Sequence, residues 1–365
     1  MKIGVYDPYL DDLGGGEKYM LTIAECLSKE HEVRIFWDDE KDLDTVLQRF
    51  TIDLSRVKVV PNIFSSSFRF LKRIIESKKF DAIIVLSDGS IPLVLSKKLF
   101  IHVQQPITAA EQNGFKNMFK RLRITKVFCN SYFSKSFVDR QFGVNSVVIY
   151  PPVSLKSKKV RKENIILHVG RFRVKDVRTI IDGVSKPVGD YKKQFVMIDI
   201  FKTMVKKGLR GWKFVIATGV KKEDKKEFDE MKKLAEGYPI EFLVNKSNDE
   251  LWGIYSRAKI YWHASGYGED LEKHPEFAEH FGISTVEAMG AGAVPVVFNA
   301  GGQKEIVGDN INGFLWNTLF ELEEKTLLLI RENKILETMS KEGIKRAKDF
   351  AGDRFCDEIK RMIED

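Results

Sequence analysis

Residues 279–298, EHFGISTVEAMGAGAVPVVF, contain the local pattern that decides the fold. A helix is predicted over Ser284–Met289, and glycines follow at positions 290 and 292. The next run, Val294–Phe298, has no polar residue, which is typical of a strand buried on both faces of a sheet. A helix followed by a buried strand indicates a parallel sheet with helices on both sides.

The same alternation extends along the whole chain. Strands are predicted at Ile3–Tyr6, Val33–Trp37, Val57–Val60, Ala82–Leu86, Phe100–Val103, Val127–Cys129, Val147–Tyr150, Ile165–Val169, Lys213–Ala217, Ile240–Val244, Ile260–Trp262 and Val294–Phe298. Helices are predicted at Glu17–Ser28, Phe68–Lys78, Tyr132–Phe142, Val196–Lys206, Lys221–Glu236, Asp249–Ala258 and Ser284–Met289. The predicted fold class is α/β, with two doubly wound domains that bind a ligand in the cleft between them.

The length of the chain and one proline pair define the domains. The chain has 365 residues, whereas single hydrophobic cores stop growing at roughly 250–300 residues. Adjacent prolines at 151 and 152 interrupt any regular element, and residues 151–162 are rich in Lys and Arg, as in a connection between domains. We therefore predict an N-terminal domain over residues 1–150 and a second domain over residues 151–345.

Composition excludes several classes of protein. Three widely spaced cysteines (26, 129 and 356) exclude a metal knuckle and argue against a disulfide framework. No apolar run approaches the roughly 18–20 residues that span a bilayer, and the first residues lack a signal-peptide core, so we expect a soluble, cytoplasmic protein. A net charge of +8 is compatible with an anionic partner, but no motif supports nucleic-acid binding.

Two motifs are open to more than one interpretation. Gly14–Gly16 precedes a predicted helix, where glycine lets the backbone approach a ligand, but a tight turn is the simpler explanation of an isolated glycine triplet. Ser284 and Glu287 fit the helix-capping pattern S-x-x-E. Alternatively, Glu287 accepts hydrogen bonds from a ribose while the helix start holds a diphosphate.

Residues 279–292, together with Gly301–Val307 and Asn312–Trp316, resemble the donor site of retaining glycosyltransferases of the family-4 type. That family has the GT-B fold, two Rossmann-like domains facing each other across a cleft, and Glu279 and Glu287 fit its E-x7-E motif. The resemblance covers nearly the whole chain. Its further members are Gly14–Gly16, His102, Asn130-Ser131, Tyr150–Val153 and Val169–Phe172.

The resemblance implies a role for each matched residue. Arg171 and Lys192, with Lys193 as the alternative lysine, would hold the donor diphosphate, and Glu287 would hold the ribose. Glu279 and His102 would contact the sugar, although a histidine at a strand end is also a common packing residue. The remaining candidates for donor binding are Gly15, Gly16, His263, Phe281, Gly282 and Ile283. His263 either packs the loop or orients the sugar.

The resemblance also has one departure and one further implication. Arg171 and Lys192 are further apart than in the family, so Val174–Asp190 is read as an insertion. The family's fold implies that residues 346–365 contain a helix, over Arg354–Ile363, that returns to the N-terminal domain.

The predicted function is retaining transfer of a sugar from a nucleotide sugar to a glycan or a lipid-linked glycan, with GDP-mannose as the first candidate donor. No cofactor or metal is expected, because the basic residues can neutralise the leaving group. The alternatives are a sugar-phosphate synthase or phosphorylase of the same fold, a non-catalytic nucleotide-sugar-binding protein, and a nucleic-acid-binding module.

Two basic, partly apolar segments, Phe68–Lys79 and Phe115–Arg123, bear on the acceptor. Each is either an ordinary helix with a solvated face or a surface that rests on anionic lipids at the inner face of the cell membrane.

Overall fold

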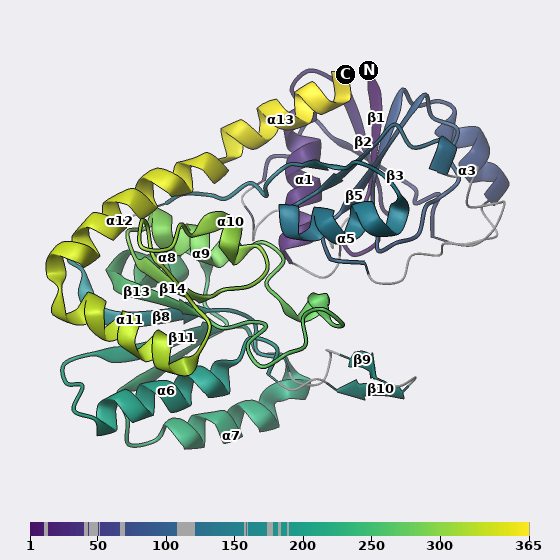
Figure 1. Cartoon of the computed structure of the whole chain (residues 1–365). Coiled ribbons are helices and arrows are strands. Elements are labelled where there is room, and N and C mark those ends of the chain that lie inside the picture. The colour runs from purple at the N-terminus through teal and green to yellow at the C-terminus, as the bar shows by residue number, and fades with distance from the viewer. Residues whose placement is uncertain are drawn as a thin grey trace. The chain divides into compact units, whose positions relative to one another are not determined.

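The structure is a computed structural model that divides into two compact units (Figure 1). It describes residues 1–10, 14–39, 43, 50, 52–65, 70–107, 121–156, 158, 160–173, 178–181, 184–187 and 190–364, with only the backbone for 178–181 and 184–187. Unit 1 comprises Met1–Pro152 and Phe350–Asp365, and unit 2 comprises Val153–Asp349. Among the described helices, none has both the length and the apolar character that crossing a bilayer requires.

Unit 1 is built on a seven-stranded parallel sheet with the order β3-β2-β1-β4-β5-β6-β7. Its strands are β1 (Lys2–Tyr6), β2 (Glu32–Phe36), β3 (Lys58–Val60), β4 (Ala82–Leu86), β5 (Lys98–Val103), β6 (Lys126–Cys129) and β7 (Val147–Val148). Every side chain of β4 is buried. Because side chains alternate along a strand, Ala82, Ile84 and Leu86 enter one core while Ile83 and Val85 enter the other.

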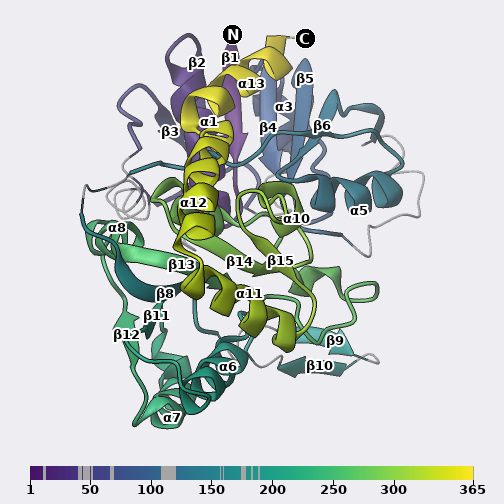
Figure 2. The same ribbon diagram turned by 60° about the vertical axis from the view of Figure 1, so that its left-hand side comes forward.

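Helices cover both faces of this sheet (Figures 1 and 2). The described helices of unit 1 are α1 (Gly15–Ser28), α3 (Phe70–Ser77), α5 (Tyr132–Phe142) and α13 (Gly352–Glu364). The core beneath α1 and α13 is separate from the core beneath α5. The sequence indicated this arrangement through strands that are apolar on both faces, and the structure confirms it.

The C-terminal helix α13 joins unit 1 although it is distant in sequence. Phe355, Ile359 and Ile363 enter the core formed by α1 and the sheet. A disulfide joins Cys26 of α1 to Cys356 of α13 across a sequence separation of 330 residues. The spacing of the cysteines argued against a disulfide framework and gave no sign of this single bridge, because it does not reveal the packing of α13 against α1. Cys129 is free and buried.

Unit 2 is built on a six-stranded parallel sheet with the order β12-β11-β8-β13-β14-β15. Its strands are β8 (Glu163–Val169), β11 (Lys213–Thr218), β12 (Ile240–Val244), β13 (Ala258–His263), β14 (Val294–Phe298) and β15 (Phe314–Trp316). Its helices are α6 (Gln194–Lys206), α7 (Lys225–Ala235), α8 (Asn248–Arg257), α9 (Ile283–Gly290), α10 (Gln303–Ile306), α11 (Leu319–Arg331) and α12 (Asn333–Ala347). Helices α6 and α7 lie on one side of the sheet and α8 and α9 on the other (Figure 1).

Several elements of unit 2 were not predicted from the sequence. The predicted insertion contains an antiparallel hairpin of β9 (Arg178–Ile181) and β10 (Val184–Pro187). Strand β15 and helices α10, α11 and α12 were also missed. The predicted helix over 221–236 begins as a short 3₁₀ turn, Lys222–Asp224, before α7.

Both sheets reverse their direction of winding once. In unit 1 the chain proceeds outward on one side from β1 and on the other from β4, which are neighbours. In unit 2 the equivalent neighbours are β8 and β13. The loops that leave two such strands diverge, so the carboxyl edge at this point is where open α/β sheets bind ligands.

We expect the disulfide to stabilise unit 1 by restricting the unfolded chain. Cys356→Ser, at a partly exposed position, should lower the free energy of unfolding of unit 1 by about 2–4 kcal/mol under non-reducing conditions. Urea unfolding of the full chain measures this change. In excess reductant the variant and the parent should unfold at the same urea concentration. A difference that persists in reductant would show that lost packing, and not the cross-link, is responsible.

Candidate active site

Three polar side chains converge at the switch between β8 and β13 in unit 2. The carboxylate Oε2 of Glu279 lies 2.6 Å from Nζ of Lys192 and 2.7 Å from Nε2 of His263. Lys192 follows β8 in the chain, and His263 is the last residue of β13. These residues, predicted from widely separated segments, therefore form one cluster.

Two glycines hold the backbone at Glu279 in place. The amide of Gly302 donates a hydrogen bond of 2.8 Å to the carbonyl of Glu279. Gly301 has a φ of 59°, and a Cβ there would stand 2.2 Å from that same carbonyl oxygen. A side chain at Gly302 would likewise meet Phe281 Cα at 2.4 Å. Only glycine permits this close approach, so the turn after β14 fixes the loop that presents Glu279.

Tyr191, which lies 85 residues before Glu276 in the chain, holds the same loop. Its hydroxyl lies 3.3 Å from each of the carbonyl oxygens of Glu276 and Ala278, just before Glu279. Burial raises the pKa of Tyr191, so its hydroxyl stays protonated and acts as a donor. The residue next to Lys192 thus anchors the loop that carries the partner of Lys192.

The structure distinguishes the two candidate lysines. Lys192 pairs with Glu279, whereas Lys193 forms an ion pair with Glu269 in the loop after β13. Lys193 has a left-handed backbone and precedes the first turn of α6, whose amides at Gln194 and Phe195 are capped by the Asp190 carboxylate. The turn therefore directs adjacent lysines to different acids.

Electrostatics keep Glu279 ionised. Burial alone would raise the pKa of this carboxyl group, but the Lys192 charge and the hydrogen bond with His263 outweigh burial and hold the pKa well below its ordinary value. An ionised carboxylate accepts hydrogen bonds and donates none. Glu279 is therefore suited to accept hydrogen bonds from hydroxyl groups rather than to donate a proton.

Two buried histidines support the cluster. Burial lowers the pKa of His263, and the contact with Glu279 only partly offsets this effect. Its Nε2 faces Glu279, and its buried Nδ1 has no hydrogen-bond partner among the described residues. His168 of β8, which was not predicted, places Nδ1 3.0 Å from the carbonyl oxygen of Trp262, and burial lowers its pKa to about 3. Both rings are neutral at neutral pH.

Glu287 lies in α9 and does not take part in a capping box. The helix begins at Ile283 after Gly282, so the capping interpretation of Ser284 and Glu287 was wrong. The hydroxyl of Tyr255 donates to Oε2 of Glu287 at 3.0 Å. Ser284 instead shares a 2.7 Å hydrogen bond with Tyr261.

Tyr261 connects the two glutamates of the motif. Its hydroxyl lies 3.4 Å from the carbonyl oxygen of Val169, at the end of β8. Burial raises the pKa of Tyr261, and the charges of Glu279 and Glu287 raise it further. Both carboxylates therefore act on one hydroxyl group, which indicates that they border the same region.

The segment between the glutamates forms the support of the site. Phe281 is buried, Gly282 precedes α9, and Ile283 is the first residue of that helix. Gln303 of α10 is almost fully buried against Gly282, and neither atom of its amide has a hydrogen-bond partner among the described residues. The contact between Gln303 and Gly282 could not be predicted, because no spacing pattern in the sequence connects the two residues.

Arg171 lies at the same edge of the sheet. It comes two residues after β8, and its side chain is exposed. Its charge acts on the hydroxyl of Tyr191, the residue that anchors the Glu279 loop. Arg171, Lys192, Glu279 and His263 therefore belong to one neighbourhood of unit 2.

The predicted residues of unit 1 form a separate set. Gly15 and Gly16 begin α1. A Cβ at Gly16 would lie 2.1 Å from the side-chain amide of Gln104, so the side chain of Gln104 packs directly over this glycine within unit 1. The glycine triplet is a helix start rather than an isolated turn.

His102 is packed among aromatic rings of unit 1. Its ring is fully buried at the end of β5, stacked on Tyr19 at 4.0 Å and on Phe128 at 4.6 Å between ring centroids. Its Nδ1 lies 3.2 Å from the Phe128 carbonyl oxygen, and burial lowers its pKa to about 3. These contacts agree with the packing interpretation of His102, and its contact with the donor sugar stays a prediction.

Residues 154–346 match the family described as Glycosyl transferases group 1. Within this match lie all the members of the Glu279 cluster.

Two relatives illustrate the range of similar proteins. The chain is 28% identical over 246 residues to the GDP-Man:Man(3)GlcNAc(2)-PP-Dol alpha-1,2-mannosyltransferase of Dictyostelium discoideum, an alignment that covers 62% of this chain and 43% of that protein. The chain thus spans less than half the length of this relative. It is 24% identical to the GalNAc-alpha-(1->4)-GalNAc-alpha-(1->3)-diNAcBac-PP-undecaprenol alpha-1,4-N-acetyl-D-galactosaminyltransferase of Campylobacter jejuni, over 96% of this chain and 95% of that protein.

Among solved structures, Anabaena Alr3699/HepE in complex with UDP is similar over 100% of both chains, with a TM-score of 0.72 and 18% identity. This likeness shows the two-domain, Rossmann-like α/β fold of the GT-B type. Because the family match extends over more than half of the sequence, the chain belongs to the glycosyl transferases group 1 family.

Proposed function

We propose that this protein transfers a sugar, with retention of the anomeric configuration, from a nucleotide sugar held by unit 2. The observation that carries the proposal is the contact of Lys192 and His263 with a single oxygen of Glu279 at the switch point of the sheet. This contact joins a cation, which we propose for the phosphate, to an ionised carboxylate, which we propose for the sugar hydroxyls.

Lys192 and Arg171 would stabilise the leaving group. When the bond between the anomeric carbon and the phosphate oxygen breaks, negative charge develops on the departing diphosphate. Cations already fixed at that position stabilise the transition state more than the ground state, which accelerates the reaction. Lys192 has three N–H donors, so it can bind phosphate while it keeps its contact with Glu279.

Glu279 and Glu287 would hold the two sugar rings of the donor. Glu279 is ionised and accepts hydrogen bonds from hydroxyls of the transferred sugar, and His263 orients it. Glu287, held by Tyr255, accepts hydrogen bonds from the ribose. The first turn of α9 lies between these carboxylates in the sequence, and the positive end of its helix dipole would complement the negative diphosphate.

For the donor we propose GDP-mannose as the first candidate, supported by the similarity to a GDP-mannose-dependent relative. For the acceptor we propose a glycan or a lipid-linked glycan, because both relatives described above act on diphosphate-linked lipids by their names. We also propose that catalysis is independent of metal, since Lys192 and Arg171 supply the positive charge.

Adjacent lysines provide a matched test of this function. Lys192→Gln should lower the rate of sugar transfer at least about tenfold, because it removes charge stabilisation from the leaving group. Lys193→Gln removes the same charge one residue away and should change the rate less than about threefold. The measurement is release of nucleotide from UDP- and GDP-sugars in the presence of a prenyl-diphosphate-linked saccharide, with the anomeric configuration of the product read by NMR.

Excess EDTA should leave this rate unchanged. A chain that consumes no nucleotide sugar, or equal effects of the two lysine variants, would contradict the proposal.

We further propose that α3 rests on an anionic membrane surface. The side chains of Leu71 and Ile75 are 73% and 61% exposed, and the side chain of Lys72 on the same helix is also exposed. Apolar side chains beside cations suit the headgroup region of a bilayer. Residues 115–120 of the second basic segment, Phe115–Arg123, lie outside the described residues, so the proposal stands on α3.

Replacing both Leu71 and Ile75 with Ser should weaken binding to vesicles of phosphatidylcholine and phosphatidylglycerol at least about threefold, because it removes the apolar contact. Phe320→Ser provides the control, since Phe320 is 69% exposed on α11 of unit 2. Sedimentation with vesicles measures binding. Equal binding of the parent and the double variant would exclude α3 as the contact.

A further inference from the structure

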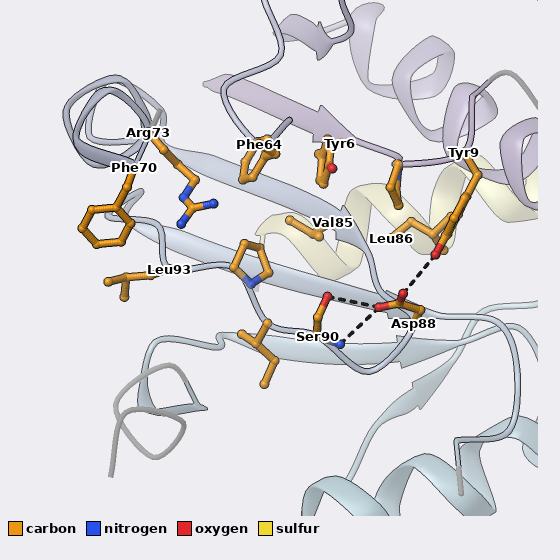
Figure 3. A pocket seen from close by; sticks show the side chains of 13 residues that line it. Tyr6, Tyr9, Phe64, Phe70, Arg73, Val85, Leu86, Asp88, Ser90 and Leu93 are labelled. Atoms are coloured by element: carbon orange, nitrogen blue, oxygen red, sulfur yellow. Dashed lines mark hydrogen bonds between the residues drawn. The ribbon is translucent and has the colours of Figure 1, made fainter. Parts of the chain in front are cut away.

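Unit 1 contains a cavity of about 700 Å³ that the proposed donor site does not use (Figure 3). Tyr6 ends β1 and Val85 lies near the end of β4, and these two residues are paired in the sheet. The cavity therefore occupies the switch point of unit 1, the place where open α/β sheets bind ligands.

The walls of the cavity are mainly apolar. The rings of Tyr6 and Phe64 are stacked with centroids 4.1 Å apart, and Leu86, Pro92 and Leu93 extend the apolar surface. A cavity of this size and character fits a hydrocarbon or ring system rather than a free sugar.

One cation lies in this apolar setting. The guanidinium of Arg73 is over the rings of Phe70, at 5.4 Å, and Phe64, at 6.0 Å. Its buried Nε has no hydrogen-bond partner among the described residues, and no described carboxylate forms an ion pair with it. Partial burial lowers its pKa, but the group remains charged. A buried donor without a partner is costly, and an anion would satisfy it.

The opposite end of the cavity has the opposite polarity. Asp88 accepts a 2.9 Å hydrogen bond from the Tyr9 hydroxyl and further bonds from Ser90. Partial burial opposes ionisation of Asp88, but these bonds prevail and lower its pKa. In Figure 3, Phe64, Tyr6 and Val85 lie between Arg73 and Asp88. An anionic ligand is thus attracted at one end and repelled at the other, which sets its direction.

We infer that this cavity binds an apolar group that carries a single phosphate, with the phosphate at Arg73 and the apolar body along Phe64 and Leu93. Resting on the proposed function, the site would receive the prenyl-phosphate portion of a lipid-linked acceptor. The ligand class follows from the pairing of an unpartnered guanidinium with apolar walls.

The test measures binding alone, without any sugar donor. Geranyl phosphate, a water-soluble prenyl phosphate, is titrated into the full chain by isothermal calorimetry, with geraniol and inorganic phosphate as separate arms. We expect geranyl phosphate to bind at least about tenfold more tightly than either arm, because each supplies only half of the recognition.

A matched pair of variants separates the cavity cation from an ordinary surface charge of unit 1. Arg73→Gln should weaken geranyl phosphate binding at least about tenfold, whereas Lys29→Gln, which removes an exposed charge at the end of α1 and outside the cavity, should change it less than about twofold. Leu93→Glu places a carboxylate in the partly exposed wall and should also weaken binding. Circular dichroism and thermal unfolding verify that each variant is folded.

Absence of binding, or equal losses in the Arg73 and Lys29 variants, would overturn the inference. Sugar transfer to a lipid-linked acceptor by a chain that binds no geranyl phosphate would refute the cavity and leave the proposed function intact. Binding by a chain that transfers no sugar would do the reverse.

Discussion

The candidate active site depends on one electrostatic arrangement, the ionised carboxylate of Glu279 held between Lys192 and His263. Contacts from other segments hold the backbone of the loop that carries Glu279. Gly301 and Gly302 admit the Glu279 carbonyl, and Tyr191 fixes the preceding residues of the loop. The low pKa of Glu279 follows from its neighbours rather than from exposure to water. This cluster is therefore preorganised, which is what a site for developing phosphate charge requires.

The two units apply the same rule of parallel sheets to different chemistry. Each sheet reverses its winding between two neighbouring strands, and each places its notable side chains at the carboxyl edge of that pair. At β8 and β13 the strand ends and loops bring together the carboxylate of Glu279, the ring of His263 and the ammonium group of Lys192. At β1 and β4 they leave an apolar cavity with Arg73 and Asp88 at its ends. The division into polar and apolar sites suits a donor that is a charged nucleotide and an acceptor that carries a lipid.

The fold could be predicted because a strand that is buried on both faces of a sheet has a nearly continuous run of apolar residues. Strands such as Ala82–Leu86 and Ile240–Val244 are found at their predicted bounds. The residues of the Glu279 cluster were predicted through motif resemblance. Tyr191, His168 and Gln303 were missed, because their roles arise from contacts between distant segments that have no spacing pattern. The same reason explains why neither the disulfide nor the stacking of His102 on Tyr19 and Phe128 could be predicted, since the partners come from other elements. The Ser284–Glu287 pattern misled because the N-cap of α9 is Gly282, two residues before the position that the motif assigns to Ser284.

The proposed chemistry rests on a division of roles, in which Lys192 binds the diphosphate and Glu279 binds the transferred sugar. The most direct test measures by calorimetry how the Lys192→Gln and Glu279→Gln variants bind a free nucleotide and its nucleotide sugar. The ligand pairs are GDP with GDP-mannose, or UDP with UDP-glucose. Lys192→Gln should weaken the nucleotide and the nucleotide sugar alike, by about tenfold. Glu279→Gln should leave nucleotide binding unchanged or tighter, because Lys192 loses its competing carboxylate, while the added affinity that the sugar contributes disappears. Equal weakening of the free nucleotide by both substitutions would contradict this division of roles.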